Sequence, residues 1–163
     1  MKKNRFLLIL IVVSALFVSC DPNGVFDKYK YMDNSTWYLD KPVEFEFEIQ
    51  DTLSKNNLYI NIRNNADYSF SNLFLITHLD FPNGKKIVDT LEYEMADTKG
   101  RFLGSGISEV KESKLWYKEA KVFELSGVHK ISIQQAMRRN GSVEGIKELK
   151  GITDVGFRIE KIE

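Results

Sequence analysis

The densest group of reactive side chains is a row of three carboxylates, Glu44, Glu46 and Glu48, on alternate residues. Two carboxylates hydrolyse a glycosidic bond when they flank that bond and their environments separate their pKa values. Three glutamates on one face of a strand share a single environment. We therefore interpret the row as a solvated outer face, or as a charged edge that discourages pairing with other chains.

Other catalytic patterns are also missing from the sequence. His78 and His129 are the only histidines, and neither has a carboxylate or a second histidine at ligand spacing. The segment Leu103–Ile107 is a small-residue turn rather than a nucleophile elbow, and no phosphate-binding glycine loop is present. The sequence predicts no catalytic residue, no metal site and no cofactor, and hence a protein that is not an enzyme.

The N-terminus has the pattern of an export signal. Lys2, Lys3 and Arg5 precede an apolar run over residues 6–17, which is too short to span a bilayer as a resident helix. Ser19 then precedes Cys20, the only cysteine of the chain, in an arrangement that resembles the lipobox of bacterial lipoproteins. We expect a cleaved signal peptide over residues 1–19, an acylated Cys20 and a short tether over residues 20–27. The alternative is a plain signal peptide with an incidental cysteine.

Composition favours one ordinary domain. The 163 residues carry 23 basic and 23 acidic side chains, and three of the basic ones lie in the leader. A mildly acidic remainder without a basic block argues against nucleic-acid binding, where neutralisation of phosphates supplies most of the affinity. With 43% hydrophobic residues the chain is not disordered. We expect a single domain over residues 28–163.

Period-two patterning predicts that this domain is all-β. In Pro42–Ile49 the apolar residues alternate strictly with the three glutamates, as in a half-buried strand. Residues 58–62 repeat the pattern. A long run of aromatic and β-branched residues over residues 68–81 ends at Pro82-Asn83-Gly84. This tight turn leads into a return strand over residues 85–95.

Further short strands are expected at residues 102–103, 115–123, 128–133 and 155–159. Residues 108–118 and 135–149 fit a short helix as well as a strand. Many short strands separated by turn signals indicate an antiparallel β-sandwich or jelly-roll-like domain.

Two short segments resemble the three-residue acceptor motif for O-glycans of the Bacteroidetes envelope. They are Asp51-Thr52-Leu53 and Asp89-Thr90-Leu91. Thr52 is expected in a loop, whereas Thr90 is expected in the middle of a strand, where access is poor. Thr52 is therefore the preferred site.

The C-terminal half carries a more specific signature. Ile133-Gln134-Gln135-Ala136-Met137-Arg138 is followed by Leu149-Lys150-Gly151-Ile152-Thr153-Asp154-Val155-Gly156-Phe157-Arg158-Ile159-Glu160-Lys161. Upstream stand Asn61-Ile62-Arg63-Asn64 and Tyr68-Ser69-Phe70-Ser71-Asn72-Leu73. Together with the lipobox, this pattern resembles the GldH family of gliding-motility lipoproteins of Bacteroidetes over essentially the whole chain.

The resemblance implies an outer-membrane lipoprotein that is required for gliding and is linked to the type IX secretion machinery. It implies no enzymatic activity and supplies no ligand. The expected partners are the membrane, through the acyl chains, and other gliding or type IX secretion proteins.

Polar residues among the apolar strand positions mark a candidate interaction patch. Asp154, Arg158 and Glu160 fall on one face of an expected strand, and Arg63 belongs to the same set. The patch is a docking surface or a structural ion-pair network that closes the last strand onto the sheet.

The favoured function is a non-catalytic interaction module held beside the outer membrane, and the alternative is a carbohydrate-binding envelope lipoprotein. Exposure of both Trp37 and Trp116 would favour the carbohydrate-binding alternative, and burial of both would exclude it. The residues after Cys20 lack the acidic run that resembles a surface-export signal, which favours the periplasmic face of the outer membrane.

Overall fold

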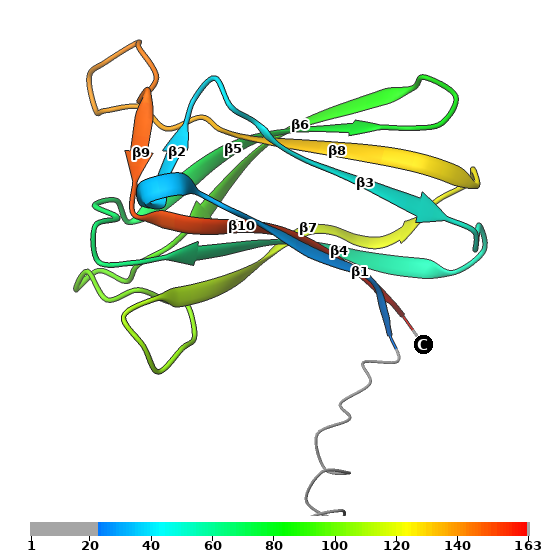
Figure 1. The fold of residues 1–163 in the computed structure, drawn as a ribbon, viewed down its shortest axis with the longest axis horizontal. Helices are drawn as coiled ribbons and strands as arrows, with labels where there is room; N and C mark the ends of the chain where they lie inside the picture. The colour runs from blue at the N-terminus through cyan, green and yellow to red at the C-terminus, as the bar shows by residue number, and fades with distance from the viewer. Residues whose placement is uncertain (1–22, 163) are drawn as a thin grey trace, which may run out of the picture.

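The computed structural model describes residues 23–162, and in them two four-stranded antiparallel sheets pack face to face (Figure 1). The predicted all-β sandwich is confirmed. The expected signal peptide and Cys20 lie outside the described residues.

The first sheet has the strand order β1-β10-β4-β7, and the second has the order β3-β8-β5-β6. A short ribbon, β2 with β9, covers one end. The bounds are β1 Gly24–Tyr31, the 3-10 turn η1 Asp33–Ser35, β2 Thr36–Tyr38, β3 Val43–Ile49, β4 Lys55–Asn64, β5 Asn72–Asp80, β6 Lys86–Glu94, β7 Lys111–Val122, β8 Gly127–Gln135, β9 Glu148–Lys150 and β10 Ile152–Lys161.

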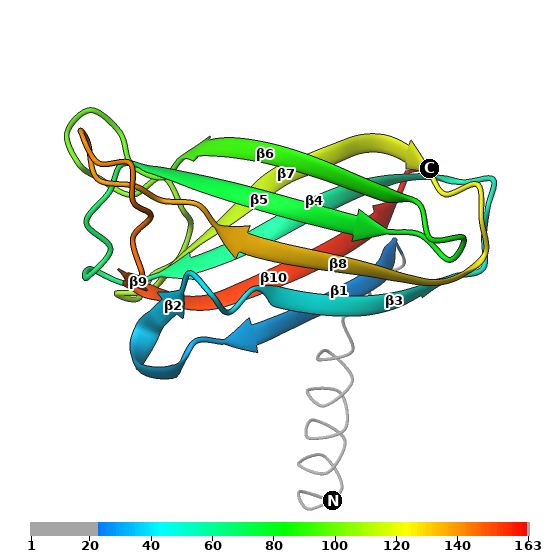
Figure 2. The ribbon, with the colours of Figure 1, turned by 90° about the horizontal axis from the view of Figure 1, so that it is seen from above.

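The core lies between the two sheets. Figure 2 shows the β3-β8-β5-β6 sheet in front of the other. Phe45 and Phe47 of β3 point inward, and their rings lie 6.4 Å and 5.5 Å from that of Phe157 on β10. Phe26 of β1 packs on the same group and fills the side where the two sheets end. Burial of apolar area of this kind is the main driving force for a fold without a disulfide.

Several predicted elements are confirmed. β3 has the expected alternation, with every apolar residue buried and the glutamates outward. The turn at Asn83-Gly84 joins β5 to β6, and Gly84 has a positive φ of 81°. Residues 108–118, for which the sequence fitted a helix and a strand equally, form a strand from Lys111 onward.

Other elements differ from expectation. Phe102 makes only an isolated β-bridge to Ala96, so the prediction of a strand at residues 102–103 was wrong. Of residues 135–149, most form a loop that leads into the three-residue β9. β1 begins at Gly24, inside the segment expected as tether, because Gly24–Tyr31 pairs along β10.

Candidate functional site

All four residues of the predicted patch lie on the outer face of the first sheet. Side chains directly opposite in neighbouring antiparallel strands point to the same face. Three rows run across β1, β10, β4 and β7 in that order, and we call them together the charged face. They are Tyr31–Asp154–Arg63–Glu112, then Tyr29–Gly156–Asn61–Lys114, then Asp27–Arg158–Tyr59–Trp116, with Glu160 beyond the last row.

Arg63 is the centre of one cluster. Its Nε donates to Oε2 of Glu112 at 2.6 Å, and its guanidinium lies 4.2 Å from the ring centroid of Tyr29. The Tyr29 hydroxyl donates to Oε1 of the same Glu112 at 3.0 Å and accepts from Nδ2 of Asn61. Burial, and then the hydrogen bond to Glu112, raise the pKa of Tyr29 to about 12. The phenol therefore stays protonated and acts as a fixed donor.

Arg158 is the centre of a second cluster. Its Nη1 pairs with Asp27 on β1, and its Nε donates to Glu160 Oε1 at 2.5 Å. Lys114 on β7 reaches the same carboxylate at 2.7 Å. Partial burial acts against ionisation of Glu160, but the hydrogen bonds from Lys114 and Arg158 outweigh it and hold the pKa of Glu160 below its usual range. These contacts join three of the four strands.

Asp154 is held differently from the other three predicted residues. It is the cross-strand neighbour of Arg63, but its carboxylate accepts a hydrogen bond from the Thr153 hydroxyl at 2.8 Å. It lines an open hollow together with Tyr31, Arg63 and Glu112. The structure therefore places Asp154 beside the Arg63 cluster and apart from the cluster centred on Arg158 and Glu160.

Aromatic side chains complete the face, and of these the sequence did not single out Tyr29 and Tyr31. Tyr59 is buried beneath Trp116, with the ring centroids 4.6 Å apart, and Lys114 Nζ lies 4.0 Å from the Tyr59 ring. Trp116 is 53% exposed, and Tyr31 is also exposed. The two lie on the edge strands β7 and β1 at opposite corners of the charged face. Alternate positions within each strand are the signal that assigns these residues to one face.

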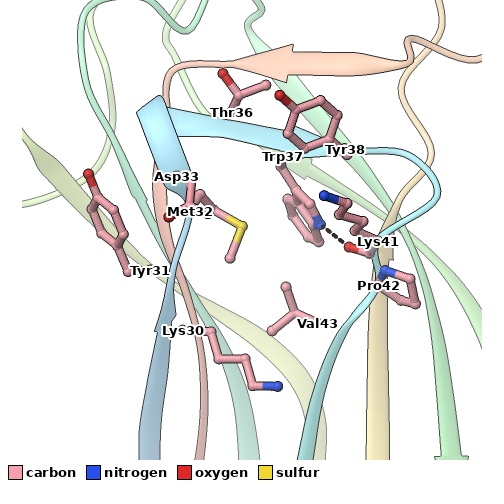
Figure 3. Close-up of a pocket in the computed structure, with 10 residues that line it drawn as sticks. All are labelled: Lys30, Tyr31, Met32, Asp33, Thr36, Trp37, Tyr38, Lys41, Pro42 and Val43. Atoms are coloured by element: carbon pink, nitrogen blue, oxygen red, sulfur yellow. Dashed lines mark hydrogen bonds between the residues drawn. The ribbon is translucent and has the colours of Figure 1, made fainter.

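Trp37 behaves in the opposite way. It is fully buried, and its indole nitrogen donates to the Lys41 carbonyl at 3.2 Å (Figure 3). It lines a cavity of about 180 Å³ together with Met32 and Val43. Ligand pockets usually measure about 300–1,000 Å³, so we assign this cavity to packing rather than to ligand binding.

The remaining candidates are dispersed. His78 is half-buried on the outer face of the second sheet, whereas His129 is fully buried on the inner face of that sheet. Glu44 pairs with Lys130 on the neighbouring strand β8 at 2.8 Å, which fits the interpretation of a solvated outer face. In residues 23–162 no group of histidine, cysteine and acidic side chains is arranged to hold a metal ion. Within the same range no helix has the length and apolarity needed to cross a bilayer.

The solvent exposure of the two candidate glycosylation sites, Thr52 and Thr90, differs from expectation. Thr90 on the edge strand β6 is exposed, whereas Thr52 in the β3–β4 loop is half-buried. The argument that placed Thr90 out of reach was wrong, because its side chain points to the outer face of a sheet edge. Glycosylation of either residue stays a prediction.

Comparison with known proteins places the chain in a family. A model described as GldH lipoprotein matches residues 24–159. A gliding motility lipoprotein GldH homolog of Christiangramia forsetii is 56% identical over 161 residues, which is 99% of this chain and 98% of the relative. The gliding motility lipoprotein GldH of Flavobacterium johnsoniae is 46% identical over 153 residues, which is 94% of each chain.

Similarity to solved structures is more distant. The VP2 subviral particle of infectious bursal disease virus gives a TM-score of 0.40 at 14% identity over 88% of this chain. This chain spans about a third (34%) of that capsid chain.

The relatives are similar in sequence over nearly their full length, and the family model covers the described sandwich almost completely. The chain is a homologue of the gliding motility lipoprotein, and as a lipoprotein it is anchored to a membrane of the cell envelope. It belongs to the GldH lipoprotein family.

Proposed function

We propose that the chain is a non-catalytic interaction component of the gliding apparatus, linked to type IX secretion, and that it docks through the charged face. The observation that carries this proposal is the pair of exposed aromatic residues, Tyr31 and Trp116, at opposite corners of a face whose ionic groups pair with one another. Aromatic residues and arginine are enriched in protein interfaces.

The ion pairs give this face a fixed geometry. Arg63–Glu112 joins β4 to β7, and Arg158–Asp27 joins β10 to β1. These contacts also fit the structural alternative, in which a charged network closes the last strand onto the sheet. Tyr31 and Trp116 are neutral and take no part in the ion pairs, so substitutions there separate docking from structure.

The same pairing supports a non-catalytic function. Glu112 pairs with Arg63 and Glu160 pairs with Arg158, and hydrogen bonds hold the pKa of Glu160 below its usual range. A general acid needs a carboxyl group whose pKa is raised towards neutrality. The charged face therefore fits binding better than proton transfer.

The proposed location is the periplasmic face of the outer membrane, with Cys20 acylated. The residues after Cys20 carry no acidic run, and this absence supports the periplasmic side. Protease added to intact cells should leave the protein uncut, and it should cleave the protein once the outer membrane is opened. Cleavage in intact cells would place the protein on the surface instead.

The docking proposal is tested in a strain that lacks its own copy of the gene. Tyr31→Ala and Trp116→Ala should reduce colony spreading and the recovery of crosslinked gliding or secretion proteins, with an unchanged protein level and a cooperative thermal transition. Val88→Ala is the matched control, because Val88 is 58% exposed on the opposite sheet. Normal spreading of both aromatic variants would contradict docking through this face. A Cys20→Ala copy tests whether the assembly also needs the anchor.

A carbohydrate-binding role is the second candidate, and one observation favours it. Trp116 presents an exposed indole, as sugar-binding faces do, but Trp37 is fully buried and Tyr59 lies covered beneath Trp116. Because one tryptophan is exposed and the other is buried, neither the outcome that would favour this role nor the one that would exclude it is met. Retention of the protein on envelope glycan, lost in Trp116→Ala, would support it over protein docking.

A further inference from the structure

One end of the sandwich carries both the start of β1 and the end of β10 (Figure 1). We call it the anchor end. The β3–β4 loop (residues 50–54), the β5–β6 turn and the β7–β8 loop lie at the same end (Figures 1 and 2). The loops that precede β2, β7 and β9 lie at the far end.

The β3–β4 loop is tied directly to the start of the domain. Lys161 donates its backbone N–H to the Asn23 carbonyl at 2.9 Å, and its Nζ pairs with Asp51 at 2.9 Å. The next residue, Ile162, donates to the carbonyl of Lys55. The loop is thereby fixed beside the point where the chain enters β1.

Asp51 shapes this loop so that one apolar side chain projects from it. Its carboxylate accepts hydrogen bonds from the backbone N–H groups of Leu53 and Ser54 and from the Ser54 hydroxyl. These bonds and Lys161 hold the pKa of Asp51 well below its usual range. Leu53 itself is 88% exposed. A turn with internal hydrogen bonds that presents a leucine to the outside is suited to an apolar partner.

The tether sets the distance to the membrane. Cys20 lies four positions before Gly24, and at about 3.3–3.6 Å per residue these four steps reach roughly 14 Å at most. Each polar headgroup layer is about 5–7 Å thick, so the anchor end lies close to the lipid surface. Exposed lysines at this end, among them Lys55 and Lys85, can extend to headgroups while their stems cover apolar surface.

We propose that the anchor end rests on the bilayer, with Leu53 inserted at the boundary between headgroups and acyl chains. This inference rests on the proposed acylation of Cys20. The contact orients the sandwich with its strands rising from the membrane. The far end then stands about 30 Å away, since β4 has ten residues and a strand rises about 3.3 Å per residue.

Site-specific labelling tests this contact in the full-length acylated protein, reconstituted into phosphatidylethanolamine and phosphatidylglycerol vesicles. Acylation consumes the thiol of Cys20, the only cysteine, so an introduced cysteine takes up the fluorophore alone. Leu53→Cys is compared with Ile107→Cys and Val143→Cys, whose native side chains are equally apolar and strongly exposed at the far end. An environment-sensitive label should shift to the blue and be quenched by spin-labelled lipid at position 53 only.

Two failures are distinguishable. If the protein does not float with the vesicles, the lipid anchor is absent and the proposed location fails together with this contact. If it floats but the label at position 53 gives the same aqueous spectrum as that at 107, the anchor stands and the contact is overturned. Quenching at position 107 or 143 as strong as at 53 would also overturn it, because the domain would then lie on its side. In solution, Leu53→Asp should have an unchanged thermal midpoint.

Discussion

Tyr29 on β1 lies directly across from Gly156 on β10, and a Cβ at Gly156 would come within 2.7 Å of ring atoms Cδ1 and Cε1 of Tyr29. The missing side chain lets the ring lie across β10. From there its hydroxyl reaches Asn61 on β4 and Glu112 on β7. A glycine in the signature of the last strand thus makes room for a contact that spans all four strands of the charged face.

Gly156→Ala should therefore destabilise the protein by about 1–3 kcal/mol, the usual cost of overpacking. The cost is steric, because a Cβ at this position meets the Tyr29 ring. In a Tyr29→Ala background the same substitution should cost almost nothing, and the double-mutant cycle in urea measures the difference. Equal costs in both backgrounds would show that Tyr29 does not account for this glycine.

Gly151 differs, because it lies between β9 and β10 with a φ of +86° and against the backbone of Tyr68. Gly151→Ala would place its Cβ 2.0 Å from the Tyr68 nitrogen. We expect a loss of more than about 4 kcal/mol, or no folded protein.

Gly141→Ala is the matched control for Gly151→Ala. Gly141 has a similar φ of +79°, but a Cβ there meets nothing within 4 Å. It should lose only the cost of the left-handed backbone, about 1–2 kcal/mol. Similar thermal midpoints for the two variants would contradict the clash with Tyr68.

Period-two patterning explains which parts of the fold could be predicted. β3 and the β5–β6 hairpin follow from residues within one segment, because alternation and turn chemistry are local. The first half of β1, residues 24–27, was assigned to the tether, because an edge strand is exposed on most positions and lacks a clear apolar face. Its strand character comes from pairing with β10, more than a hundred residues later in the chain.

The charged face was predictable to the same extent. Asp154, Arg158 and Glu160 share a face because they alternate on one strand. The contact of Tyr29 with Glu112 joins residues 83 positions apart and depends on the register of β1, β10, β4 and β7. No local pattern specifies that register, so only the structure shows that Tyr29 and Tyr31 belong to the charged face.

The two tryptophans should respond oppositely to a soluble quencher. Trp37→Phe leaves the exposed Trp116 as the emitter, and acrylamide should quench it strongly. Trp116→Phe leaves the buried Trp37, whose emission should be blue-shifted and protected. Equal quenching in the two variants would contradict the burial on which the assignment of the docking face rests.

The last prediction concerns His129, which is buried in a ring of aromatic side chains. The rings of Phe47, Phe81 and Phe123 lie 5.0–5.5 Å from its imidazole. Nδ1 lies 3.0 Å from the Gly127 carbonyl, whereas Nε2 is buried without a hydrogen-bond partner in residues 23–162. Burial, and then the charge of nearby Lys121, lower the pKa of His129 below its usual 6.5.

The folded protein therefore keeps His129 neutral at a pH where the unfolded chain binds a proton. The stability contributed by the neutral form is complete above pH 6.5 and declines as the pH falls below it. The loss approaches about 1.4 kcal/mol for each unit by which the two pKa values differ. Urea unfolding between pH 8 and pH 5 should show this decline in the wild type, and His129→Phe should remove it. His78→Gln, on the outer face of the same sheet, should keep it. A decline that persists in His129→Phe would assign it to another group.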